Sequence, residues 1–131
     1  MKTQRMSEVL YMLLALLALD AVWLTSNMAS SQSMFAKLQG SPLTIRWVPA
    51  ILVYVLIVGA VWFFAVRETK TVQDAGLKGG VLGLAMYGVY DLTNYATLSK
   101  YPLWFTASDM AWGTFLCASV AATGALMKTK A

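Results

Sequence analysis

The sequence contains no histidine and only one cysteine, and only 12% of its 131 residues are charged. Without histidine, a histidine-ligated metal centre and a histidine general base are both excluded. The lone Cys117 cannot form a disulfide within the chain or build a cysteine-rich metal site. The scarcity of charge excludes an ordinary soluble domain, about a quarter of whose residues are charged, and also a disordered chain.

Apolar residues make up most of what is present. They account for 59% of the chain. A helix that crosses a membrane needs about 20 mostly apolar residues. Four stretches are long and apolar enough, at about 9–27, 47–66, 77–96 and 103–127. The sequence therefore predicts an all-α membrane protein, with one domain over residues 1–131 and four transmembrane helices in an antiparallel bundle.

The basic residues predict the orientation of this bundle. Those on the side of the termini and the second loop are Lys2, Arg5, Arg67, Lys70, Lys78, Lys128 and Lys130. The opposite side holds Lys37, Arg46 and Lys100. The excess on the first side predicts that both termini are cytoplasmic. A cell membrane is the default location, although organelle and viral membranes carry the same signals. Since the basic residues lie at the ends of apolar runs, we expect no nucleic-acid partner.

The longest predicted connection, from Met28 to Arg46, lies on the side opposite the termini. It is rich in serine, and Gly40 and Pro42 indicate a turn. Within it we expect a short helical piece at the membrane interface, formed around Met34, Phe35 and Leu38.

Small residues predict where helices pack. The fourth span carries them at four-residue spacing, at Gly113, Cys117, Ala121 and Ala125. The third span pairs Gly76 with Gly80 and Gly79 with Gly83. Such spacings let helix backbones approach closely in lipid, although small residues are also simply common in membrane spans. Because four short helices bury little surface, we expect a homo-oligomer or partners in a membrane complex, in addition to the lipid bilayer.

Three aspartates lie inside the apolar spans, at Asp20, Asp91 and Asp109. A charged aspartate at the centre of a membrane helix costs about 3 kcal/mol, so such residues usually face the bundle interior and mark a functional path. Measured from the predicted span ends, all three lie roughly 8–11 Å below the same membrane face. We therefore expect the three carboxyl groups to lie at one level.

Each aspartate has polar or aromatic neighbours at helical spacing. Asp20 and Asp109 are each followed by a tryptophan three residues later. The predicted ligand-binding or polar-network residues are Asp20, Trp23, Tyr87, Tyr90, Asp91, Thr93, Asn94, Asp109 and Trp112, with Tyr95 as a secondary contact. Tryptophan N–H and tyrosine O–H groups are the donors that a buried carboxylate needs.

These acids allow several interpretations. No Lys or Arg lies at the same depth, so some of the carboxyls are protonated at neutral pH or a cation neutralises them. Oxygen ligands alone favour a proton or an alkali or alkaline-earth ion, and the identity of any metal stays open. Alternatively, the acids form a structural hydrogen-bonded clamp, or they occupy unrelated solvated positions.

Three segments carry a family resemblance. They are LALDAVWL at 17–24, YGVYDLTNYATL at 87–98 and SDMAWGT at 108–114. With them the chain resembles, over nearly its whole length, the small membrane proteins of domain-of-unknown-function family 2177. The resemblance implies a four-helix membrane protein with these aspartates as signature positions. It implies no activity and no cofactor.

The leading functional hypothesis is a small channel, carrier or binding protein for a proton, a cation or a small cationic solute. The alternative is an accessory or structural subunit of a larger membrane assembly, with the aspartates as clamps. An intramembrane enzyme that uses paired carboxylates on lipid is a third, weaker interpretation. No nucleophile–base pair or phosphate loop is present, so the sequence favours a protein without catalytic residues and without a cofactor.

Overall fold

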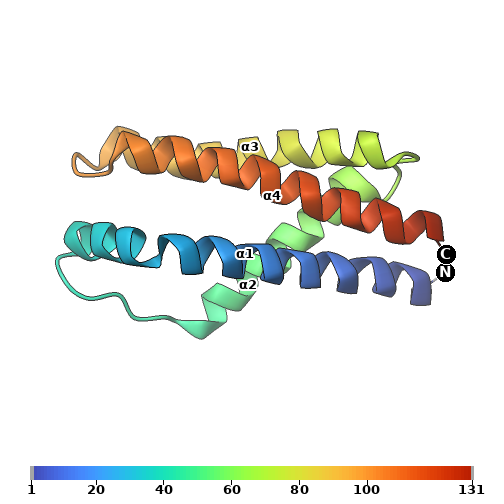
Figure 1. Ribbon diagram of the computed structural model, residues 1–131, viewed down its shortest axis with the longest axis horizontal. Coiled ribbons are helices and arrows are strands. Elements are labelled where there is room, and N and C mark those ends of the chain that lie inside the picture. The colour runs from blue at the N-terminus through green and yellow to red at the C-terminus, as the bar shows by residue number, and fades with distance from the viewer. Residues whose placement is uncertain (1, 131) are drawn as a thin grey trace.

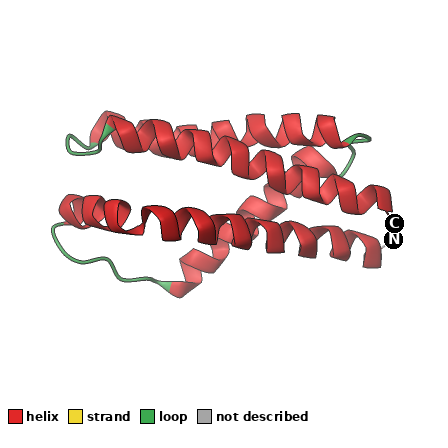
Figure 2. Ribbon diagram, in the orientation of Figure 1, coloured by secondary structure: helices red, strands yellow, loops and turns green. Residues whose placement is uncertain are grey.

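The computed structural model describes residues 2–130, which form helices and connecting loops (Figures 1 and 2). The elements are α1 (Lys2–Gln39), α2 (Trp47–Val61), a π-helical segment (Trp62–Val66), α3 (Val72–Thr97) and α4 (Leu103–Lys130). The side chains of Lys2 and Lys130, which entered the orientation count, and of Met28, where the first loop was predicted to begin, lie outside those described.

The arrangement of the helices follows from the short loops between them. Both chain ends lie at one end of the bundle, together with the loop that joins α2 to α3 (Figure 1). The other two loops lie at the opposite end. We call these the termini end and the loop end. α3 packs against α4 along the most extensive contact in the molecule, and α1 also packs on α4. α2 crosses the bundle obliquely.

The first helix is longer than the sequence predicted. Instead of ending near Asn27, α1 continues through the predicted loop to Gln39. The segment around Phe35 is helical, but the prediction of a separate piece was wrong, because the segment belongs to this one continuous helix. The physical reason is that the serine-rich stretch contains no proline or glycine until Gly40, whose φ of 82° ends the helix in the left-handed region.

The second predicted span matches the structure closely. α2 and the π-helical segment together cover 47–66, with Pro49 in the first turn, where a proline removes no hydrogen bond. After Arg67 the chain turns, and Thr71 caps α3 by accepting a hydrogen bond from the backbone N–H of Asp74, at 3.1 Å.

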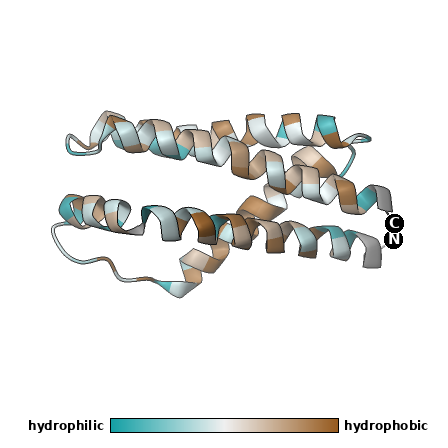
Figure 3. Ribbon diagram, in the orientation of Figure 1, coloured by the Kyte–Doolittle hydropathy of each residue, from teal (hydrophilic) through white to brown (hydrophobic). Residues whose placement is uncertain are grey.

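Three helical segments are long and apolar enough to cross a membrane: 5–27, 47–66 and 103–128. The brown that marks hydrophobic residues is most prominent in the middle of α1 and in α2 (Figure 3). The sequence predicted four such spans. α3 is not among the three, because Lys78, Asp91 and its tyrosines make it more polar. The structure therefore shows an all-helical membrane protein with three strongly apolar spans.

Small residues bring α3 and α4 together. A Cβ atom added at Gly79 would lie 2.5 Å from the Cys117 carbonyl oxygen, and one at Gly83 would lie 2.3 Å from the Gly113 carbonyl oxygen. Ala121 and Ala125 on the same side of α4 are also buried. The small-residue ridge of α4 thus packs inside this chain, and α3 covers much of it.

The apolar core fills the half of the bundle nearest the termini. It takes Met12 and Leu16 from α1, Val61 from α2 and Val120 from α4, all fully buried. The other half, toward the loop end, holds the aspartates. The bundle is therefore closed by side chains near the termini and polar farther along.

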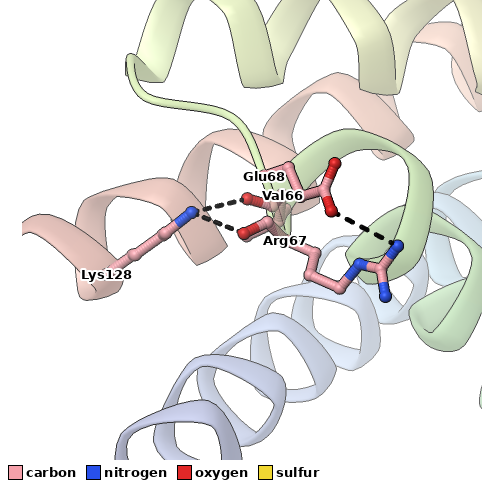
Figure 4. Close-up of polar contacts among 4 residues, drawn as sticks. All are labelled: Val66, Arg67, Glu68 and Lys128. Atoms are coloured by element: carbon pink, nitrogen blue, oxygen red, sulfur yellow. Dashed lines mark hydrogen bonds and ion pairs between the residues drawn. The ribbon is translucent and has the colours of Figure 1, made fainter. Parts of the chain in front are cut away.

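A lysine joins α4 to the end of the π-helical segment. The Lys128 ammonium group donates hydrogen bonds to the carbonyl oxygens of Val66 and Arg67 at 3.1 and 2.7 Å (Figure 4). It donates a third to the carbonyl oxygen of Thr69 at 3.0 Å. Carbonyl groups at a helix C-terminus lack partners within the helix and carry partial negative charge, so they favour a cation.

We expect Lys128→Met to lower the free energy of unfolding by about 2 kcal/mol, because it removes a charged donor from these carbonyls and keeps the apolar stem. Denaturation with sodium dodecyl sulfate in mixed micelles measures this loss. Lys70→Met is the matched control, since the Lys70 side chain is exposed. Equal stability of the two variants would contradict a structural role for Lys128.

Candidate ligand-binding site

A cavity of about 410 Å³ lies toward the loop end, between α1, α3, α4 and the loop after α1. Its lining contains two of the three intramembrane aspartates and most of the predicted aromatic residues. The lining residues are Asp20, Trp23, Leu24, Asn27, Ser31, Gln32, Phe35, Leu43, Ile45, Tyr87, Tyr90, Phe105, Asp109 and Trp112. None of these described residues is Lys or Arg, so the cavity carries acidic side chains without basic ones.

Two carboxyl groups, those of Asp20 and Asp109, line this cavity. Asp20 on α1 accepts a hydrogen bond from the hydroxyl of Tyr54 on α2. Asp109 on α4 is only 8% exposed and interacts electrostatically with both Asp20 and Asp91. The groups that act most strongly on the Asp109 carboxyl are these two acids, Asp91 first. Asp109 therefore has no basic partner among the described side chains.

Asp91 has a different environment. It is fully buried on α3, and the Tyr101 hydroxyl donates a 2.6 Å hydrogen bond to its Oδ1 atom. Its Oδ2 atom is buried and has no hydrogen-bond partner among the described residues. Burial, followed by the hydrogen bond to Asp91, raises the pKa of the Tyr101 phenol above its ordinary value. Asp91 thus ties α3 to the loop before α4 and does not line the cavity.

Stacked aromatic rings form one wall of the cavity. Trp23 on α1 and Trp112 on α4 lie with ring centroids 4.9 Å apart and ring planes inclined by only 9°. Nearer the loop end, Phe35 meets Phe105 edge to face at 5.3 Å. The indole N–H of Trp112 is buried without a hydrogen-bond partner. On this side the cavity is therefore lined by closely packed indole and phenyl rings.

The structure divides the remaining predicted residues. Tyr87 lies within electrostatic range of Asp20 and Asp109. Tyr90 interacts with Asn94, which also reaches Tyr101. Thr93 and Tyr95 are exposed side chains on α3, outside the cavity lining. Their helical spacing from Asp91 placed them near that residue in sequence but not on the face that the cavity occupies.

Two tyrosines that bind the carboxyls were missed by the sequence analysis. Tyr54 carries the only hydroxyl group in α2, and a single hydroxyl in an apolar span could have indicated a polar contact with another helix. Tyr101 follows α3 in a loop, and no spacing rule links it to Asp91. Phe35, which was assigned to the membrane interface, and Phe105 were also missed as part of the site.

The arrangement of the acids limits which metals fit. Among the described residues, no group of three His, Cys, Asp or Glu side chains is close enough to hold a metal ion. The three aspartates interact, but Tyr54 engages Asp20 and Tyr101 engages Asp91. What the cavity offers is a pair of carboxyl groups beside aromatic faces.

The helical fold and its three apolar spans define an integral membrane protein of the α-helical class. Residues 6–126 match the family described as "Predicted membrane protein (DUF2177)", and the chain belongs to this family. The resemblance noted in the sequence is thereby confirmed. Neither the curated proteins nor the solved structures contain a match to the chain.

Proposed function

We propose that α3 is a fourth membrane-spanning helix and that both termini are cytoplasmic. α3 has 26 residues, which at 1.5 Å per residue is about 39 Å, longer than the roughly 30 Å hydrocarbon core. Its buried glycines pack on α4, so its polar groups can face protein rather than lipid. The excess of basic residues on the side of the termini supports the orientation.

We further propose that the protein binds a small cationic solute in the cavity between α1, α3 and α4. The observation that carries this proposal is the buried Asp109 carboxyl, which lines the cavity without a basic partner. A buried carboxylate without a counter-ion is costly, and a bound cation supplies the missing charge. The adjacent tryptophan and tyrosine rings favour an organic ammonium ion, because aromatic faces attract such cations.

The shape of the cavity favours a binding protein or a carrier over an open channel. Between the cavity and the termini end, fully buried Met12, Leu16 and Val120 fill the bundle. A solute that enters from the loop end therefore meets a closed apolar floor. Passage across the membrane would require the helices to repack, as in a carrier that opens to each side in turn.

The accessory-subunit alternative gains less support. Its main argument was the small-residue ridge on α4 as a contact for another polypeptide. Gly79 and Gly83 of α3 pack on this ridge within the chain, which removes most of it from any partner. A substitution such as Ala121→Leu would therefore disturb the fold itself.

Asp109→Asn is expected to weaken the binding of choline, used as a probe ammonium ion, by at least about tenfold, which equals 1.4 kcal/mol. The variant keeps the shape of the side chain and removes the charge that attracts the cation. Calorimetric titration in detergent micelles measures the affinity. Fluorescence provides a second readout, because Trp23 and Trp112 line the cavity.

Two controls accompany this experiment. Glu68→Gln removes one negative charge from an exposed side chain at the termini end, and choline should bind it as it binds the parent protein. The neutral isostere 3,3-dimethylbutan-1-ol should not bind detectably. If the isostere bound as well as choline, or if Asp109→Asn had no effect, the proposed cation site would be wrong.

A further inference from the structure

A second cavity meets the first at three shared residues. It has a volume of about 400 Å³ and is lined by Val53, Ile57, Met86, Tyr87, Tyr90 and Asp109. Tyr87, Tyr90 and Asp109 also line the first cavity. The same buried carboxyl is thus accessible from both spaces. We call the second space the side cavity.

The side cavity lies between α2 and α3, on the flank of the bundle. α2 meets α3 mainly through the π-helical segment near the termini end, because α2 crosses the bundle obliquely (Figure 1). Val53 and Tyr90 are each about half exposed, at 51% and 52%. Val53 belongs to a strongly apolar span, so this exposed surface faces the hydrocarbon of the membrane. The side cavity therefore opens toward lipid.

The two cavities differ in chemistry. Toward the loop end, the lining includes the amides and hydroxyl of Asn27, Ser31 and Gln32 together with the carboxyls. The side cavity has an apolar mouth formed by Val53, Ile57 and Met86, and Asp109 lies where the two spaces join. A molecule that fits both has a positive charge at one end and an apolar chain at the other.

We propose that the ligand is a single-chain amphiphilic ammonium ion, whose cationic group lies at Asp109 and whose alkyl chain occupies the side cavity. This inference rests on the proposed cation-binding function and specifies its substrate class. No described residue in either lining is basic, so a phosphate group would meet only acids. Charge complementarity therefore favours an amphiphile with net positive charge over a zwitterionic phospholipid.

The test compares alkyltrimethylammonium ions of increasing chain length, from ethyl to octyl, in nanodiscs of phosphatidylcholine. Binding is followed by tryptophan fluorescence. Affinity is expected to rise by about fourfold for each methylene that the side cavity takes up. Partition into the bilayer also raises the apparent affinity, so the parent protein is compared with Val53→Phe, which narrows the side cavity under the same conditions.

Val55→Phe provides the matched control. Val55 lies on the same helix, is 59% exposed and does not line either cavity. We expect Val53→Phe to reduce octyltrimethylammonium affinity at least about tenfold and to leave choline affinity unchanged. Val55→Phe should leave both affinities unchanged. This pattern, together with weak binding of neutral octanol, would support the proposal.

Other outcomes separate the two proposals. If choline binds but chain length gives no gain beyond that seen in Val53→Phe, the amphiphile inference is wrong and the cation site stands. Equal losses in Val53→Phe and Val55→Phe would also overturn the inference, because the effect would not be specific to the side cavity. If neither choline nor octyltrimethylammonium binds, the proposed function itself fails.

Discussion

Gly83→Ala is expected to destabilise the folded protein by about 2 kcal/mol, although alanine is the better helix former. The added Cβ atom would lie 2.3 Å from the Gly113 carbonyl oxygen and 2.7 Å from the Cys117 Cβ atom. One of these contacts is with backbone, which cannot move aside as a flexible side chain does. α3 and α4 must therefore separate along their most extensive contact.

Gly59→Ala is the control for this substitution. A Cβ atom at Gly59 would meet nothing within 4 Å, so the variant should gain about 0.5–1 kcal/mol from helix propensity alone. Unfolding in sodium dodecyl sulfate mixed micelles compares both variants with the parent. If Gly83→Ala were as stable as Gly59→Ala, the close approach of α3 and α4 would not exist.

Asp91→Ala is expected to cost about 3 kcal/mol of unfolding free energy. The substitution removes the acceptor of the Tyr101 hydroxyl, leaves that hydroxyl buried without a partner and opens a cavity at a fully buried position. Asp91→Asn keeps an oxygen acceptor for Tyr101, so we expect it to cost less than about 1 kcal/mol. The same denaturation experiment measures both variants.

Choline titration distinguishes a structural role of Asp91 from direct contact with the ligand. Asp91 does not line the cavity, although it interacts with Asp109, so Asp91→Asn should still bind choline, in contrast to Asp109→Asn. The sequence analysis placed all three aspartates in one ligand-binding site or polar network, and in the structure Asp20 and Asp109 line the cavity whereas Asp91 does not. If Asp91→Asn folded normally but lost choline binding, Asp91 would have to be assigned to the binding site.

Hydropathy and spacing predicted the helical membrane fold, since each apolar run must satisfy its backbone hydrogen bonds internally. The sequence analysis placed the end of α1 too early, because serine-rich stretches are typical of loops. The helix instead continues to Gln39, directly before Gly40 and Pro42. The different surroundings of Asp91 and Asp109 were not predictable. They depend on the rotation of α3 and α4 about their own axes, which tertiary packing sets. The pairing of Tyr54 with Asp20 likewise requires the oblique path of α2.

The length of α1 has a consequence for how a solute loses its water. The apolar span of this helix ends at Asn27, and 12 further residues at 1.5 Å each extend the helix by about 18 Å past that span. Ser31 and Gln32 on this extension line the cavity. An entering cation can exchange its hydration shell for hydroxyl and amide groups first, then for aromatic faces, and finally for the carboxyls. Dehydration in such steps avoids one large energy barrier, so the protruding turns of α1 would govern the rate of entry more than the final affinity.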